Sequence, residues 1–214
     1  METESRSSWR IVHGSAFVAL TAGTMLVPGL RRWPWIWIVP LAGYFLMPVF
    51  VPRLRGSMGW FRLGKVSGVS IAAMVGIMAL TSLALVVFNA IAKPDLGDYR
   101  TALPFERFGG VIASGVIFSI VNATLEELVF RGVLFDAVRS QWNMWVTLMA
   151  TSVLFGLGHL HGYPPGLWGT VLAVVFGFAM GVLRVWTGGF ALPIVAHMGA
   201  DATIYWILVR LGAV

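Results

Sequence analysis

Seven long apolar stretches follow one another along this 214-residue chain, and they constrain its fold more than any other feature. Each is close to the roughly 20 residues that an α-helix needs to cross about 30 Å of hydrocarbon. Only 11% of the residues are charged, whereas soluble domains carry about 25%. The sequence therefore predicts an all-α protein, a polytopic membrane helix bundle of about seven transmembrane helices in a single membrane-embedded domain, residues 1–214. The expected helices are 11–30, 33–52, 67–92, 109–125 with a continuation to about 138, 143–160, 165–183 and 189–210.

The net charge of +6 does not point to a nucleic-acid partner. The fifteen Lys and Arg residues are scattered among the short segments between the apolar stretches, and no basic stripe alternates with aromatic residues. Residues in such places suit the anionic headgroups of a lipid bilayer. The chain has no cysteine, which excludes disulfides, thiolate metal sites and a cysteine nucleophile.

Charged residues within the predicted helices are the first candidates for function, because each costs roughly 2.5–3.5 kcal/mol to place at the centre of a membrane helix. Glu127 and Arg131 are four residues apart, so they share a helix face and can pair. Glu126 lies about 100° around the helix and is not explained by that pair. Two adjacent carboxylates need two environments, one held ionised by arginine and one free to exchange a proton. We therefore assign Glu127 to a structural pair with Arg131 and Glu126 to chemistry.

Two histidines in later predicted helices add imidazole groups. Phe155 and His159 share a helix face at a spacing of four residues, and so do His197 and Asp201. A single histidine in an apolar helix is usually a satisfied core residue. A helical rise of 1.5 Å per residue, however, places Glu126 and these three polar residues within one membrane band about 13 Å deep. The three helix segments can therefore meet.

The chemistry that such a set can perform is the activation of water. A carboxylate beside an imidazole can take a proton from water, and a second imidazole can hold the oxyanion that forms on an attacked carbonyl. A serine nucleophile is not favoured, because no Gly-x-Ser-x-Gly sequence is present. Two histidines and a carboxylate are also a familiar zinc set, so zinc held by Glu126, His159 and His197 stays open, although His-Glu-x-x-His is absent. The other histidines, His13 and His161, are expected near the membrane surface.

Together these residues form three motifs in chain order, which are Glu126-Glu127-x-x-x-Arg131-Gly132, Phe155-Gly-x-x-His159 and His197-x-x-x-Asp201. In this order the motifs resemble those of a known family. It is the CAAX-protease and bacteriocin-processing family, also called the abortive-infection family, whose eukaryotic members are the type II CAAX prenyl endopeptidases. The resemblance covers about residues 109–205, and each motif alone is weak.

The resemblance implies a glutamate-dependent intramembrane endopeptidase. By that likeness Glu126 activates water, His159 assists it, and His197 with the residue four further on stabilises the oxyanion. The supporting residues of the motifs are then Glu127, Arg131 and Phe155. Family members were first described as metalloproteases, so zinc stays open as a cofactor.

One position departs from the family pattern. Many members carry Asn at the last motif position, where this chain has Asp201. An amide can donate a hydrogen bond to an oxyanion, whereas an ionised carboxylate cannot. Asp201 is therefore expected either to be protonated or to orient His197.

The resemblance also implies a partner and a location. The substrate is expected to be a membrane-embedded or lipid-anchored protein or peptide, and the protein a multi-pass component of the bacterial inner (cytoplasmic) membrane. Two alternatives stay open: a non-catalytic binding protein of the bacteriocin-immunity type with the same fold, and a small proton-coupled transporter. Carboxylates and histidines inside a helix bundle also form proton relays. A transporter more often shows paired repeats or broken helices in matching halves, and this sequence shows neither.

Overall fold

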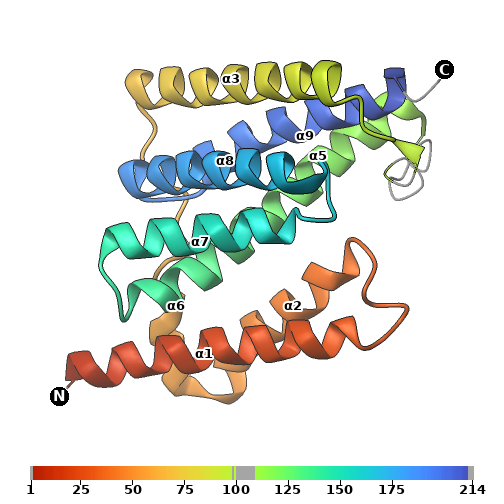
Figure 1. Ribbon diagram of the computed structural model, residues 1–214. Coiled ribbons are helices and arrows are strands. Elements are labelled where there is room, and N and C mark those ends of the chain that lie inside the picture. The colour runs from red at the N-terminus through yellow and green to blue at the C-terminus, as the bar shows by residue number, and fades with distance from the viewer. Residues whose placement is uncertain (1, 98, 100–108, 212–214) are drawn as a thin grey trace.

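The computed structural model describes residues 2–97, 99 and 109–211 (Figure 1). Within these residues every regular element is helical, which confirms the predicted all-α class. A 3-10 helix, η1 (Pro52–Met58), follows α2, and a π-helical segment, η2 (Leu128–Leu134), separates α5 from α6. The α-helices are α1 (Glu2–Met25), α2 (Trp35–Phe50), α3 (Gly68–Ala92), α5 (Val111–Glu127), α6 (Phe135–Arg139), α7 (Met144–Gly158), α8 (Gly166–Thr187) and α9 (Ala191–Leu211).

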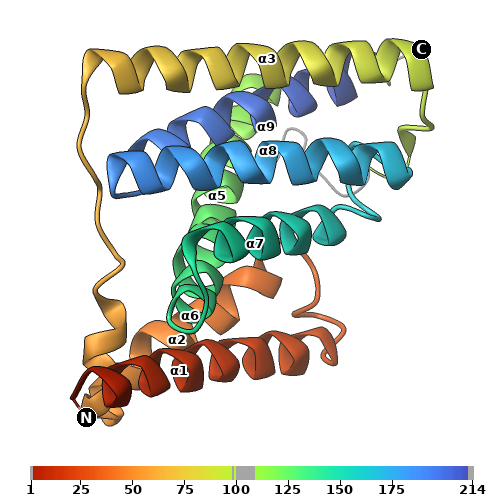
Figure 2. The ribbon, with the colours of Figure 1, turned by 60° about the vertical axis from the view of Figure 1, so that its left-hand side comes forward.

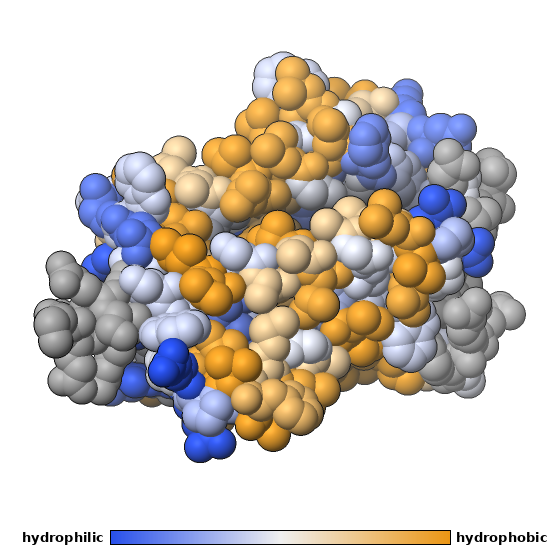
Figure 3. All heavy atoms as spheres, turned by 90° about the horizontal axis from the view of Figure 1, so that it is seen from below, coloured by the Kyte–Doolittle hydropathy of each residue, from blue (hydrophilic) through white to orange (hydrophobic). Residues whose placement is uncertain are grey.

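The lengths and composition of these helices make the chain a multi-pass integral membrane protein. Four helices of the described residues are long and apolar enough to cross a membrane: α3, α8, α9 and the continuous rod 111–139 formed by α5, η2 and α6. The helices α2 and α7 are apolar but shorter. With α1 they give seven helical rods, and six lie close to the predicted places. α1 begins at Glu2 and ends at Met25, whereas the sequence predicted 11–30. Figure 3 shows hydrophobic residues across the middle of one face and hydrophilic residues toward its two ends, which is the pattern expected of a surface that meets lipid.

The rods pack as two groups joined by one oblique helix. In Figures 1 and 2, α1 and α2 lie together on one side of the molecule, and α3, α8 and α9 lie together on the other. The rod of α5, η2 and α6 crosses obliquely from α9 toward α1, and α7 lies against α8. This crossing places the middle of the rod, where the glutamates lie, next to α7, α8 and α9.

The middle of the oblique rod changes from α-helical to π-helical winding directly after Glu127. π-Helical turns are rare and occur frequently at functional sites. The segment holds Arg131 and Gly132, and both are buried. A Cβ atom on Gly132 would collide with the six-membered ring of Trp60, so the close approach of this helix to the segment before α3 requires glycine.

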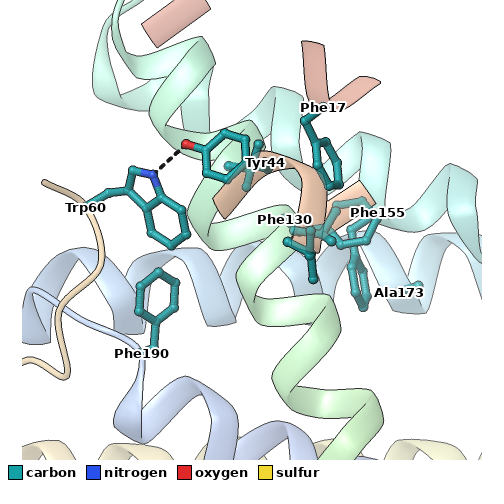
Figure 4. Packing of buried hydrophobic residues seen from close by; sticks show 10 residues of the cluster. Phe17, Tyr44, Trp60, Phe130, Phe155, Ala173 and Phe190 are labelled. Atoms are coloured by element: carbon teal, nitrogen blue, oxygen red, sulfur yellow. Dashed lines mark hydrogen bonds between the residues drawn. The ribbon is translucent and has the colours of Figure 1, made fainter. Parts of the chain in front are cut away.

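A cluster of aromatic side chains joins α2 to the later helices. The indole Nε1 of Trp60 donates a hydrogen bond of 3.0 Å to the hydroxyl of Tyr44, and its ring meets Phe190 edge to face at 5.4 Å (Figure 4). Phe130 and Phe155 meet edge to face at 5.0 Å in the same cluster. Such pairs add about 0.5–1.5 kcal/mol each to the burial of their surface. The cluster therefore holds η2 and α7 in a fixed relation beside the candidate site.

A buried histidine fastens α1 to its neighbours. His13 has no exposed surface, so the expectation that it lies at the membrane surface is wrong. Its Nδ1 lies 2.5 Å from Oγ of Ser57, and Nε2 donates to the carbonyl of Tyr44 at 2.8 Å. The imidazole also stacks on the Tyr44 ring at 3.6 Å. Because both ring nitrogens have partners within the fold, the surroundings of His13 indicate a structural role.

Candidate active site

A buried ionic cluster lies where α5 passes into η2 and meets α9. Glu127, with no exposed surface, accepts a hydrogen bond of 2.9 Å from Nη1 of Arg131, so the predicted pair forms. The same carboxylate oxygen, Oε1, lies 2.8 Å from Nδ1 of His197. The other terminal nitrogen of Arg131 donates to the carbonyl of Gly177 on α8 at 3.2 Å. Glu127 therefore links α5 to η2 and α9, and Arg131 extends the cluster to α8.

Hydrogen-bond chemistry fixes how the His197 ring is used. A carboxylate paired with arginine only accepts hydrogen bonds, so Nδ1 of His197 carries the hydrogen in its bond to Glu127. Nε2 is then the nitrogen left for other partners. A carboxylate that sets the tautomer and orientation of a histidine in this way is a recurring feature of catalytic and metal sites. Sequence reasoning gave Glu127 only the pair with Arg131, whereas the structure shows that it also positions His197.

Two further carboxylates face the free Nε2 of His197. Oε2 of Glu126 lies 3.6 Å from it, and Oδ1 of Asp201 lies 3.8 Å from it. Both distances exceed a hydrogen bond, so neither group occupies Nε2. Oε2 of Glu126 is buried and has no hydrogen-bond partner among the described residues. Because an unpaired buried carboxylate oxygen costs free energy, such an atom needs an explanation, and a catalytic role is one.

Asn122 belongs to this group, although sequence reasoning did not single it out. Its Nδ2 donates to Oδ2 of Asp201 at 3.2 Å. Its Oδ1 accepts a hydrogen bond of 3.0 Å from the indole Nε1 of Trp33, which lies between α1 and α2. Asn122 is four residues before Glu126 on α5, and this helical spacing was the signal that could have identified it.

Phe155 and His159 approach the cluster from α7. The helix ends at Gly158, so His159 is its C-terminal cap and not, as the sequence predicted, a residue inside the helix. The two rings still lie 4.4 Å apart, and Nδ1 of His159 donates to the Phe155 carbonyl at 2.9 Å, which leaves Nε2 available. Phe155 also lies 5.9 Å from the His197 ring and 4.4 Å from the Arg131 guanidinium. Phe155 therefore packs against both imidazoles and against the guanidinium.

A cavity of about 320 Å³ lies beside these rings. His159, His197 and Asp201 form its polar part, whereas most of its wall is apolar and comes from α3, α8 and α9. Tyr163, in the turn after α7, also lines it, and burial raises the pKa of its hydroxyl to about 12, so that group stays protonated. Glu126 is not a lining residue and adjoins the cavity through His197. The arrangement is an apolar chamber with two imidazoles in its wall.

The residues present do not fit a zinc site. Within the part of the chain that the structure describes, no three His, Asp or Glu side chains are gathered so that they could hold a metal ion. Among the described ion pairs Glu126 is joined to His197 and not to His159. The set Glu126, His159 and His197, which the sequence left open for zinc, is therefore not assembled as ligands.

Comparison with known proteins identifies the part of the chain that holds this site. Residues 108–203 match the family model described as type II CAAX prenyl endopeptidase, Rce1-like. Over these residues the chain is similar to the Rce1-like family. The matched residues include every candidate site residue that the motifs predict, and the Rce1-like family implies a membrane protease.

Two curated proteins are similar to this chain. A protein of Escherichia coli named "Uncharacterized 24.3 kDa protein" is 29% identical over 161 residues, which is 73% of this chain and 72% of that protein. A protein of Bacillus subtilis (strain 168) named "Putative membrane peptidase YdiL" is 31% identical over 83 residues, which is 39% of this chain and 32% of that protein. No solved structure matches the chain. The Rce1-like resemblance read from the motifs is confirmed by the family match.

Proposed function

We propose that this protein is a glutamate-dependent intramembrane endopeptidase that hydrolyses a peptide bond of a membrane-embedded or lipid-anchored protein or peptide. One observation carries the proposal. The buried, unpaired Oε2 of Glu126 lies 3.6 Å from Nε2 of His197, whose other ring nitrogen is fixed by Glu127. A general base and an oriented imidazole thus meet beside an apolar cavity.

Glu126 acts as the general base. A water oxygen about 2.8 Å from Oε2 can also lie about 2.8 Å from Nε2 of His197, because the two atoms are only 3.6 Å apart. Glu126 takes one proton from this water, and the hydroxide oxygen forms a bond to the substrate carbonyl carbon. Arg131 forms its ion pair with Glu127 and not with Glu126, so Glu126 stays free to accept this proton.

The two histidines handle the charge and the proton that follow. In its imidazolium form His197 carries a hydrogen on Nε2 and can donate to the oxyanion of the tetrahedral intermediate. When the intermediate collapses, the carbon–nitrogen bond breaks and the leaving nitrogen takes up the proton that Glu126 removed from water. His159, whose Nε2 is available beside the same cavity, assists this transfer.

The cavity wall supports an apolar substrate. Leu80, Leu172 and Phe176 are among the aliphatic and aromatic side chains that line it, and they come from α3 and α8. Burial of an apolar segment in such a cavity is worth about 25 cal/mol per Å² of surface. The curated relative named "Putative membrane peptidase YdiL" supports the peptidase class of the reaction.

Cleavage of a membrane peptide by the purified protein in detergent tests the proposal. The parent should cleave, whereas Glu126→Gln and His159→Ala should each reduce kcat by at least 100-fold while the melting temperature stays close to that of the parent. His161→Ala is a matched control, because His161 is exposed and lies two residues from His159. Full activity of either site variant would refute the proposed roles, and substrate binding without any turnover by the parent would refute catalysis.

A further inference from the structure

A chain of two hydrogen bonds runs from the turn before α2 to the edge of the site. Nε1 of Trp33 donates to Oδ1 of Asn122 at 3.0 Å, and Nδ2 of Asn122 donates to Oδ2 of Asp201 at 3.2 Å. Asn122 and Asp201 are 8% and 3% exposed, so the second bond is shielded from solvent. Neither Trp33 nor Asn122 belongs to the three motifs.

The direction of this chain is fixed by the chemistry of its first member. An indole nitrogen can only donate, so the oxygen of the Asn122 amide must face Trp33. The amide nitrogen must then face Asp201, and Oδ2 of Asp201 accepts from it. The other oxygen, Oδ1, is the one that lies 3.8 Å from Nε2 of His197. Trp33 therefore determines, through one amide, which carboxylate oxygen is turned toward the site.

We propose that Asn122, oriented by Trp33, is a positioning residue for peptide hydrolysis, which holds Asp201 by Oδ2 and so presents Oδ1 to His197 and the reacting carbonyl. This proposal rests on the proposed function, because it assumes that the protein hydrolyses a peptide bond. The hydrogen bond between Asn122 and Asp201 does not depend on that function. Asn122 touches neither Nε2 of His197 nor the cavity, so it acts through Asp201.

The same hydrogen bond explains how either Asp or Asn can serve at position 201. Because Oδ2 accepts from Asn122, the proton of a neutral Asp201 carboxyl lies on Oδ1, which can then donate to the oxyanion. If Asp201 is replaced by Asn, the donor Nδ2 of Asn122 selects the amide oxygen of the new side chain. The NH2 group of residue 201 then faces His197, where it can donate to an oxyanion. Asp201→Asn is therefore expected to retain cleavage, and it is the reference for the exchange of both residues.

Exchange of the two residues separates a positioning role from a merely structural one. In Asn122→Asp combined with Asp201→Asn, an amide and a carboxylate still face each other, so a structural role predicts recovery. A positioning role predicts loss, because the carboxylate at 122 now draws the NH2 group of residue 201 toward itself and leaves only the amide oxygen facing His197. Activity therefore depends on which position carries the amide and which carries the carboxylate, and not only on the presence of one of each.

Steady-state cleavage by this set of variants tests the proposal. Asn122→Ala should lower kcat on the order of tenfold, the loss expected for a misplaced charged group, with KM within twofold. The exchanged double variant should fall at least tenfold below Asp201→Asn in kcat. Trp33→Phe should show a smaller loss than Asn122→Ala, and Trp35→Phe, at an exposed position, should match the parent. A double variant as active as Asp201→Asn would overturn the proposal.

An infrared measurement keeps this test separate from that of the proposed function. The carboxyl band of residue 201 is the band that disappears in Asp201→Asn. It should shift in Asn122→Ala, because Oδ2 loses its hydrogen-bond donor. If the parent cleaves no peptide but the band shifts, the proposed function fails while the positioning contact stands. A band that stays unchanged overturns the positioning role whatever the activity.

Discussion

Replacement of Glu127 by Gln would test whether one carboxylate holds the site together. Its Oε1 accepts from Arg131 at 2.9 Å and from His197 at 2.8 Å, and neither Glu127 nor Arg131 is more than 2% exposed. Glutamine has nearly the same shape, so the change removes charge without creating a cavity. It leaves the guanidinium of Arg131 buried without a counter-ion.

The expected loss follows from that uncompensated charge. Removal of one partner of a buried ion pair costs about 3–5 kcal/mol. For a chain of this size each kcal/mol of lost stability lowers Tm by about 2–4 °C, so Glu127→Gln should lower Tm by roughly 6–20 °C. Its kcat should fall as well, because His197 loses the acceptor that fixes its Nδ1.

Thermal unfolding in detergent, followed by tryptophan fluorescence at one fixed scan rate, measures this loss. Glu127→Gln combined with Arg131→Met is the informative companion, because removal of both charges abolishes the uncompensated one. The double variant should melt above Glu127→Gln, although it has no salt bridge, and should stay inactive. A Tm for Glu127→Gln within about 2 °C of the parent, roughly 1 kcal/mol or less, would refute the inference that this carboxylate neutralises Arg131.

Three other predictions follow from contacts in the fold and the site. His13→Ala should lower Tm, because a stacked ring and two hydrogen bonds between α1, α2 and η1 are lost. The kcat should change little, because His13 does not line the cavity, and a tenfold or larger fall in kcat would argue against a purely structural role. Gly132→Ala should cost about 1–3 kcal/mol in unfolding free energy, since the added methyl group meets the Trp60 ring, and Trp60→Leu in the same chain should restore part of that loss. Treatment with a zinc chelator should leave peptide cleavage unchanged, because no described group of three ligands is gathered at the site; loss of cleavage that added zinc restores would contradict this.

The sequence alone was sufficient to predict where the helices lie and that Glu127 pairs with Arg131 within one of them. Each apolar stretch forms its rod largely where predicted, because the length of a membrane helix depends on local composition and the thickness of hydrocarbon. Glu127 and Arg131 pair because four residues of helix bring them to one face, and the same spacing relates Phe155 to His159 even though the helix ends between them.

Only the tertiary structure decided which groups act on one another. The second partner of Glu127 is His197, 70 residues away, and Asn122 meets Asp201 across 79 residues. The cavity takes part of its wall from α3, a helix without any of the motifs. Helical periodicity fixes relations within a few turns of one rod. Contacts between rods depend on crossing angles, on small residues such as Gly132 and on the π-helical turn at η2, which are set by packing of the whole bundle and leave no local signature in the chain.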